Sequence, residues 1–527
     1  MYEHGDYSRE LKKYYNANTG RWISRILPSM QRKRKGIRVY DYPIQYDRYF
    51  SNRHIARVQY FLTYIYRRMI DEERSEAMWV YISSNFQRAI LSNDFKHLID
   101  ILENQINCIY VERRGSNPYD SRKSKVYFKL KDEYFDAVES TSIIYSDPLS
   151  KSLQRQYNRL ISPHEFLLYE VNVFKEHITV GEHSLDSLFT QRIKRKQEED
   201  RAQLFWDTLS KSKYSSLVSR IDRETLGWNK EQVDSYRVRF EKRYKSLVDT
   251  LTEYNELNDV SAVRLQKFAN RIINPIIVKD REFRSIVRID GEECIEYDMS
   301  TGYASLLYTI LDAITNNQRS NVDYNIVSRY WQENKDLPKY DFRVFLDEYG
   351  MCFGKNSIDF YHRIGMKLLN YIKNNFNLTE EDDFIQKAGA LIQGKPYRNY
   401  IKDLVIRLIN SHPHHYKNVR FIGGRFTFEE LSTVLFTEEV THFLNDIKFN
   451  KIYKDSSRRL WANASKMVMK QEVKVMRDIH NALIDSNIPY VSLHDGILVG
   501  KGRLSVVDAI VKSVVSKYRF VQFKYKL

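Results

Sequence analysis

The sequence predicts an α+β protein built from more than one domain, and three observations support this prediction. The chain has 527 residues, more than a single hydrophobic core usually serves. Helical patterns, with apolar residues three and four positions apart, and short runs of β-prone residues occur in both halves of the chain. The intervening segment, from about 150 to 270, is mostly helical and strongly charged.

The composition favours a negatively charged partner. Lys and Arg exceed Asp and Glu, which gives a formal net charge of +16, and nucleic acid is the commonest polyanion available. An acidic protein or a membrane surface would satisfy the same charge. The chain also contains 39 Tyr and 27 Phe, and rings among basic residues suit stacking on bases as well as filling a core.

The cysteines and the apolar runs indicate in which cellular compartment the protein is expected. Cys108, Cys294 and Cys352 lack the paired spacing of a disulfide framework or a zinc site. The N-terminus has no apolar signal core, and no apolar run approaches the roughly 20 residues of a membrane span. We therefore expect a soluble, cytoplasmic protein with no membrane partner.

Residues 1–50 form a basic N-terminal arm in the predicted organisation. They contain the run QRKRKGIR at 31–38 among many tyrosines and show little amphipathic periodicity. Such an arm is either simply solvated or contacts phosphates.

Residues 51–145 predict a winged-helix-like module. Three helical patterns between 54 and 105 are followed by two β-prone runs, 107–112 and 124–130, which a basic, turn-rich loop connects. Three helices followed by a hairpin is the order of a winged helix-turn-helix domain. Such domains commonly bind nucleic acid, and some bind other proteins instead.

Residues 146–270 predict a helical region. The run QRIKRKQEEDRAQLFWDTL at 191–209 carries charges of both signs, which is typical of a solvated helix face. No repeat or low-complexity linker marks the limits of this region.

Two aspartates are the first candidates for chemistry. Asp298 follows a β-prone run in EECIEYDMSTGYASLLYTIL (292–311), just before a helical pattern. Asp495 lies in IPYVSLHDGILVG (488–500), which predicts a hairpin because Asp-Gly is a strong turn signal. If both lie at strand ends of one sheet, they form the carboxylate pair that holds two Mg²⁺ ions for phosphoryl transfer. Taken singly, each is as readily explained as a loop or turn residue.

With these motifs, the sequence from about 265 to 527 resembles the single-subunit right-hand polymerases, namely family A DNA polymerases and bacteriophage-type RNA polymerases. Asp298 matches the aspartate of motif A, and Arg398 and Lys402 in GKPYRNYIKDLVIRLIN match the basic helix of motif B. His494 and Asp495 match the hairpin of motif C. The resemblance implies a right-hand polymerase fold, with a palm and inserted fingers in 271–527 and a thumb-like region in 146–270.

The resemblance also assigns roles to other residues. Arg271 and Arg284, in ANRIINPIIVKDREFRSIV, match arginines that contact template and primer. Independently of the resemblance, His494 beside a metal-binding aspartate would either orient a phosphate at the primer end or simply hydrogen-bond the turn. Arg398 and Lys402 are four residues apart, so one helix face presents both to a nucleoside triphosphate, where they would offset the charge on the leaving pyrophosphate. A solvated basic helix face is the alternative for this pair.

Three positions depart from the family pattern. Gly496 replaces the acidic residue or serine that follows the motif C aspartate, and Asn410-Ser411 replaces a Tyr-Gly pair after motif B. Tyr303 replaces the glutamate that excludes a ribose 2′-hydroxyl in family A DNA polymerases. Its ring would serve the same steric purpose, which favours deoxynucleotides, or it simply packs the first turn of a helix.

Together these features imply a template-directed nucleotidyltransferase. It would use two Mg²⁺ ions on Asp298 and Asp495, a nucleic-acid template and primer, and nucleoside triphosphates. A DNA polymerase is favoured, a single-subunit DNA-directed RNA polymerase is the first alternative, and a non-catalytic winged-helix replication or regulatory protein is the second. A metal-dependent nuclease would also use paired carboxylates but would leave Arg398 and Lys402 without a purpose.

Overall fold

The computed structural model describes most of the chain, in the ranges 15–16, 21–22, 36–71, 79–114, 125–211, 228–257, 259–260, 262–266, 269–300, 302–316, 318–323, 340–353, 358–377, 395–410, 420–421, 426–449 and 462–526. Most of the predicted basic arm, including residues 31–35, and most of the basic loop at 115–124 lie outside these ranges. No helix in the described part of the chain is both long and apolar enough to cross a membrane.

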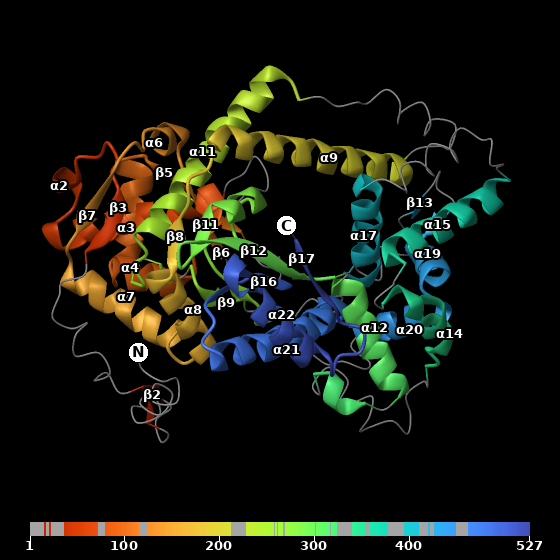
Figure 1. The fold of residues 1–527 in the computed structure, drawn as a ribbon. Coiled ribbons are helices and arrows are strands. Elements are labelled where there is room, and N and C mark those ends of the chain that lie inside the picture. The colour runs from red at the N-terminus through yellow and green to blue at the C-terminus, as the bar shows by residue number, and fades with distance from the viewer. Residues whose placement is uncertain are drawn as a thin grey trace.

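A six-stranded sheet lies at the centre of the molecule, between the N-terminal elements and the helices that precede motif C (Figure 1). Its order is β15-β16-β12-β11-β8, and β17 also pairs with β12. All the pairings are antiparallel. The strands are β8 (Ile178–Val180), β11 (Val287–Ile289), β12 (Glu292–Met299), β15 (Tyr490–Ser492), β16 (Gly496–Gly500) and β17 (Phe523–Lys526).

Each face of this sheet packs on its own hydrophobic core, because side chains alternate between the two faces of a strand. Tyr297 and Val499 point into a core formed with the C-terminal helices. Leu498 and Val491 point into a core shared with the N-terminal half. The sheet therefore joins the two halves of the chain into one packed body.

The N-terminal half contains a second, three-stranded sheet in the order β4-β6-β5. Phe128 of β6 is buried beneath it and contacts Phe61 of α3 edge-on, at 5.3 Å between ring centroids. The elements are β3 (Ile37–Tyr40), α2 (Tyr46–Tyr49), α3 (Asn52–Asp71), β4 (Val80–Tyr81), α4 (Ser84–Leu91), α5 (Phe95–Asp100) with the π-helical turn Ile101–Gln105, β5 (Ile109–Arg114), β6 (Lys125–Leu130), α6 (Asp132–Asp136) and β7 (Thr141–Ile144). Two short strands, β1 (Tyr15–Asn16) and β2 (Arg21–Trp22), pair with each other near the N-terminus.

Helices follow in the middle of the chain, as the charged helical pattern predicts. They are α7 (Asp147–Leu160), α8 (Glu165–Glu176), α9 (Leu185–Lys211) and α11 (Lys230–Thr252). After them come the short strands β9 (Arg264–Leu265) and β10 (Ile272–Ile273) and the 3₁₀ helix η3 (Arg281–Ile286).

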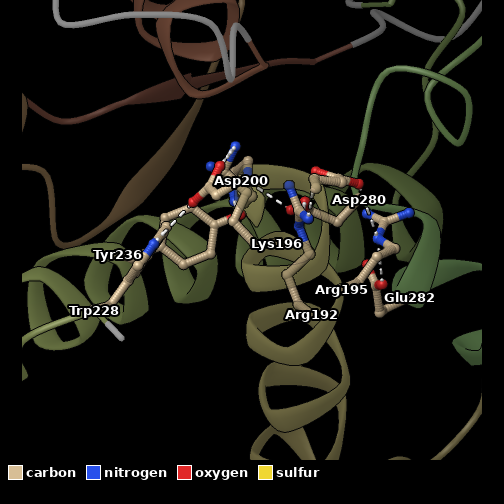
Figure 2. Close-up of polar contacts among 10 residues, drawn as sticks. Arg192, Arg195, Lys196, Asp200, Trp228, Tyr236, Asp280 and Glu282 are labelled. Atoms are coloured by element: carbon tan, nitrogen blue, oxygen red, sulfur yellow. Dashed lines mark hydrogen bonds and ion pairs between the residues drawn. The ribbon is translucent and has the colours of Figure 1, made fainter. Parts of the chain in front are cut away.

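Helix α9 is fixed to this middle region by buried ion pairs (Figure 2). Asp280 accepts from Arg192 Nε of α9 and from Arg243 Nε of α11, each at 2.7 Å. Arg195 of α9 pairs with Glu282 of η3 at 3.0 Å. Arg192 is 2% exposed and Asp280 4% exposed. Because losing one partner would leave a buried charge uncompensated, this cluster fixes the position of α9.

From this anchor, α9 runs across the molecule to contact α17, the helix of motif B (Figure 1). One turn beyond Arg192, Lys196 pairs with Asp200 at 3.0 Å, and the indole of Trp228 donates to Asp200 at 2.9 Å. Helix α9 therefore links the N-terminal half directly to the elements inserted between motifs A and C.

Those inserted elements are mainly helical. They are α12 (Gly302–Thr315), the 3₁₀ turns η4 (Arg319–Asn321) and η5 (Gly350–Cys352), α14 (Arg343–Tyr349), α15 (Phe360–Phe376), α17 (Lys395–Asn410), β13 (Arg420–Phe421), β14 (Phe426–Thr427), α19 (Phe428–Leu435), α20 (Glu438–Lys448) and α21 (Ala462–Asp485). The 3₁₀ turn η6 (Lys501–Arg503) and α22 (Leu504–Val515) follow motif C and precede β17. The predicted hairpin at motif C and the helix and strand after it are all present.

The structure differs from the predicted organisation in two places. Strand β8 lies inside the predicted helical region 146–270 yet pairs with β11 in the central sheet. Strand β3 lies inside the predicted arm yet pairs with β7, and Ile37 and Val39 are fully buried. Both strands are only three or four residues long, and such short apolar runs carry too little periodicity to be assigned from sequence.

Candidate active site

Asp298 and Asp495 lie side by side at one end of the central sheet. Asp298 is the penultimate residue of β12 and is the cross-strand neighbour of Gly496 on β16. The backbone N–H of Met299 donates to the carbonyl of Asp495 at 2.8 Å. Both aspartates are partly exposed. Asp495 lies in the turn that precedes β16, so the backbones of two aspartates about 200 residues apart in sequence are adjacent.

Gly496 allows the two strands to approach closely. A Cβ added at this position would lie 2.5 Å from the carbonyl oxygen of Tyr297 and 3.3 Å from Oδ1 of Asp298. A glycine is required where backbone approaches backbone this closely. The departure of Gly496 from the family pattern therefore has a structural cause in this chain.

Lys524 brings a positive charge to the other side of Asp298. It lies on β17 directly opposite Asp298 and is exposed. The sequence alone did not indicate this residue, because nothing local predicts that the C-terminal strand pairs with β12. A row of three cross-strand neighbours results, in the order Gly496, Asp298, Lys524.

Glu472 of α21 is a third carboxylate near the pair. It is 4% exposed and accepts from Arg271 Nη2 at 2.5 Å. Burial raises the pKa of Glu472 to about 8; Arg271 opposes this, whereas the negative charges of Asp495 and Asp298 raise the pKa further. The charges of Asp298 and Asp495 therefore act on Glu472.

A sequence signal for Glu472 existed. Val468, Glu472, Val475 and Ile479 are spaced by four, three and four residues, which is the spacing of one buried helix face. The three apolar members are fully buried. A glutamate at a core position of an amphipathic helix is uncommon unless a charge compensates it, and Arg271 supplies that charge here.

Arg271 and Arg284, both predicted to contact nucleic acid, are engaged in ion pairs. Arg271 pairs with Glu472, and Arg284 Nη1 donates to Glu296 at 2.7 Å. Glu296 lies on β12 two residues before Asp298, on the same face of the sheet. Both arginines therefore hold carboxylates beside the site in the absence of nucleic acid.

His494 lies next to Arg271. Burial, and then the positive charge of Arg271, lower the pKa of His494 to about 4, so its imidazole is neutral at physiological pH. Its Nδ1 is buried and has no hydrogen-bond partner among the described residues. A small pocket borders this side chain and is lined by residues that include Phe166, Arg271, Arg477, His480 and His494.

Arg398 and Lys402 project from α17, as predicted. Arg398 Nε donates to Asp359 Oδ2 at 2.5 Å, and its guanidinium lies 5.0 Å from the ring centroid of Tyr361. Lys402 is half-buried one turn further on and, within the described residues, has no hydrogen-bond or ion-pair partner. Its charge is therefore available to a ligand.

Tyr361 of α15 connects this helix to the aspartates. It is 1% exposed, and its hydroxyl has no hydrogen-bond partner in the described part of the chain. Burial raises the pKa of Tyr361; Arg398 opposes this, and the charges of Asp359 and Asp495 add to it. Tyr361 therefore contacts Arg398 and is within the electrostatic influence of Asp495.

Tyr303 lies at the start of α12, five residues after Asp298. Its hydroxyl donates to Asn410 Oδ1 at 2.9 Å and contacts Ser465 Oγ at 3.1 Å. Burial raises the pKa of Tyr303. The ring is thereby held between α12, α17 and α21. Asn410, one of the residues that departs from the family pattern, is the residue that fixes it.

The donors at this site suit Mg²⁺. Within the described residues, no group of three or more His, Cys, Asp or Glu side chains is placed to hold a metal, and Glu472 is already paired with Arg271. Mg²⁺ in phosphoryl-transfer sites is commonly held by one or two carboxylates together with substrate phosphates and water. Asp298 and Asp495 meet that requirement.

Comparisons with known proteins find likenesses to solved structures. No family model and no curated protein matches the sequence. The POL domain of Pol1 from M. smegmatis, in complex with DNA primer-template and dNTP, is similar over 72% of this chain and 73% of that chain, with 15% sequence identity and a TM-score of 0.24. At this identity and TM-score, the likeness carries no weight for function.

Proposed function

We propose that this protein is a template-directed nucleotidyltransferase, a DNA polymerase that extends a 3′-hydroxyl by two-metal phosphoryl transfer. One observation carries the proposal: Asp298 at the end of β12 and Asp495, in the turn before β16, have adjacent backbones, and α17 carries Arg398 and Lys402. A carboxylate pair and two cations suit a reaction that joins a hydroxyl to a triphosphate.

Each residue has a role in this reaction. Asp298 and Asp495 would hold two Mg²⁺ ions, which activate the attacking hydroxyl and stabilise charge on the transferred phosphoryl group. Arg398 and Lys402 bind the β- and γ-phosphates and offset charge on the leaving pyrophosphate. Neutral His494 donates a hydrogen bond to a phosphate at the primer end. Arg271 and Arg284 contact template and primer.

The N-terminal module supplies further nucleic-acid contacts in this proposal. Its elements run in the order α3, β4, α4, α5, β5, β6, and its strands are arranged β4-β6-β5. That order supports a winged-helix assignment. The module shares its core with Val491 and Leu498 of the motif C hairpin, so nucleic acid bound there would be held rigidly relative to the site.

A single assay tests the proposal. Primed and unprimed DNA and RNA templates are each offered NTPs or dNTPs with Mg²⁺, and products are resolved by length. We expect extension of a primed template by dNTPs. Extension by NTPs alone would instead identify an RNA polymerase on the same fold. Nucleic-acid binding without metal and without incorporation of any nucleotide would overturn the proposal in favour of a non-catalytic binding protein.

Replacing Lys402 with glutamine is expected to lower kcat/KM for the nucleoside triphosphate about a hundredfold, the usual cost of removing one preorganised group that stabilises charge in the transition state. Arg407→Gln is the matched control, because Arg407 lies on the same helix but pairs with Asp403 at 2.6 Å. Steady-state extension of a primed template measures both. Equal effects of the two substitutions would contradict the assigned role of Lys402.

Replacing Tyr303 with alanine is expected to reduce discrimination against ribonucleotides about tenfold or more, because the ring no longer occupies the space beside the sugar. Tyr303→Phe keeps the ring and loses only the hydroxyl contacts to Asn410 and Ser465, so its selectivity should match that of the wild type. The ratio of kcat/KM for dNTP and NTP is the measurement. If alanine leaves this ratio unchanged, the ring only packs the helix.

A further inference from the structure

The three-stranded sheet of the N-terminal module has an outer face that the proposed reaction does not use. Along β4, Val80 is fully buried while Tyr81 is 45% exposed. Along β5, Ile109 is 1% exposed while Tyr110 is 47% exposed. Because side chains alternate along a strand, the second member of each pair points away from α3. We call this outer face the aromatic platform.

The platform consists of aromatic and basic side chains in adjacent rows. Tyr81 of β4 is the cross-strand neighbour of Tyr127 of β6, and Lys129 of β6 is that of Tyr110 of β5. The rings of Tyr81 and Tyr127 are 5.6 Å apart, and those of Trp79 and Tyr110 are 6.5 Å apart, between centroids. Four rings, one from each of the three strands and one from the residue before β4, thus share one surface.

Lysines lie against these rings. Lys125 Nζ is 5.6 Å from the ring centroid of Tyr81, and Lys131 Nζ is 4.9 Å from that of Tyr110. The acidic residues at this surface are Glu112, on β5, and Asp132, which lies 3.4 Å from Lys129. With three lysines and two acids, the platform carries a positive balance among its described residues.

We propose that the aromatic platform binds an unpaired stretch of nucleic acid, which is the single-stranded template if the proposed function holds. Exposed rings stack on bases of any sequence, and lysines between them contact the phosphates. A duplex gains little here, because its bases are already stacked on each other. The platform is distinct from the two aspartates, and its binding requires neither a metal nor a nucleotide.

The lysines of the aromatic platform favour a nucleic acid over a protein as its partner. A protein interface centred on exposed tyrosines is typically depleted of lysine, whereas Lys125 and Lys131 lie directly against the rings. The net charge of +16 acts in the same direction. A protein partner would leave single-strand affinity unaffected by changes at the platform.

The test compares single-stranded and duplex binding by fluorescence anisotropy, using full-length protein, a labelled oligo-dT of about 20 nucleotides and a blunt duplex of equal length. The platform variant is Tyr81→Leu with Tyr110→Leu. We expect about tenfold weaker single-strand binding per ring removed, hence about a hundredfold in all, with duplex binding unchanged. Lys125→Gln should lower the slope of log affinity against log salt by about 0.7.

Two controls make the outcome specific. Tyr81→Phe with Tyr110→Phe retains both rings and should bind as the wild type does. Tyr145→Leu removes a tyrosine that is 63% exposed outside the platform and should have no effect. Unchanged single-strand affinity in the leucine variant, or equal losses for single strand and duplex, would overturn the proposal.

The platform and the proposed reaction can fail separately. If the leucine variant loses single-strand binding while the wild type extends no primer under any condition, the platform stands and the polymerase proposal fails. If primers are extended while the leucine variant binds single strands as the wild type does, the polymerase proposal stands and the platform proposal fails. If both stand, the leucine variant should still extend primers on templates with a one-nucleotide overhang.

Discussion

Replacing Asp298 or Asp495 with asparagine is expected to lower the rate of primer extension at least about a thousandfold. Asparagine keeps the size of the side chain but removes the negative charge that would hold Mg²⁺, and metal ions in such sites contribute several kcal/mol of transition-state stabilisation. At 1.36 kcal/mol per tenfold change in rate, a loss of about 4 kcal/mol corresponds to three orders of magnitude.

The measurement is single-turnover extension of a labelled primer with Mg²⁺, alongside template-primer affinity by anisotropy. Affinity should change little, because neither aspartate is assigned a contact to nucleic acid. Glu293→Gln is the matched control, because Glu293 is an exposed carboxylate on the same strand as Asp298, with its side chain 65% exposed. Retention of synthesis within tenfold of the wild type in either asparagine variant would contradict the assigned site.

The double variant adds a sharper test of whether the two aspartates act together. Residues that act as one unit show strongly non-additive effects, so the double substitution should cost no more than the worse of the single ones. If the rate loss in the double variant equals the product of the two single losses, Asp298 and Asp495 contribute independently. A shared metal site would then be excluded.

Motif order in the sequence predicted the type of element on which each candidate residue lies. Asp298, Arg398, Lys402 and Asp495 each lie in an element of the predicted type. This succeeded because a strand before a helix, an amphipathic basic helix and an Asp-Gly hairpin are local patterns. Local patterns depend on backbone preferences that the neighbouring residues already determine.

The contacts that complete the site depend on long-range packing instead. Glu472 matters because α21 places it beside Arg271, 201 positions away. Lys524 matters because the C-terminal strand pairs with β12, and Tyr361 because α15 lies against α17. Strand β8 likewise forms by pairing with β11, which is more than 100 positions away in the sequence. None of these contacts has a signature within a window of ten or twenty residues.

Replacing Gly496 with alanine is expected to reduce both stability and activity. The new Cβ would lie 2.5 Å from the carbonyl oxygen of Tyr297 and 3.0 Å from the Cα of Asp298. These are backbone atoms of the central strand, which β16 and β17 flank, so they cannot rotate away as a side chain can. We expect a loss of about 3 kcal/mol in the free energy of unfolding, the upper end of the usual cost of overpacking.

Activity should fall as well, because the strands can accommodate the methyl group only by separating at Asp298 and Asp495. A displacement of about 1 Å at reacting groups costs on the order of a hundredfold in rate. Gly502→Ala is the control, since its Cβ would meet only the flexible carboxylate end of Glu292, at 2.7 Å. Chemical denaturation and single-turnover extension should both show a defect in Gly496→Ala alone.

This outcome bears directly on the non-catalytic alternative, because Gly496 departs from the polymerase pattern and such a departure would be expected in a protein that has lost activity. If Gly496→Ala unfolds more readily and extends primers more slowly, the glycine is a requirement of strands that bring two carboxylates together. If the variant is as stable and as active as the wild type, the close approach of β12 and β16 is not needed at the site. Gly496 would then again be a mark of a degenerate palm.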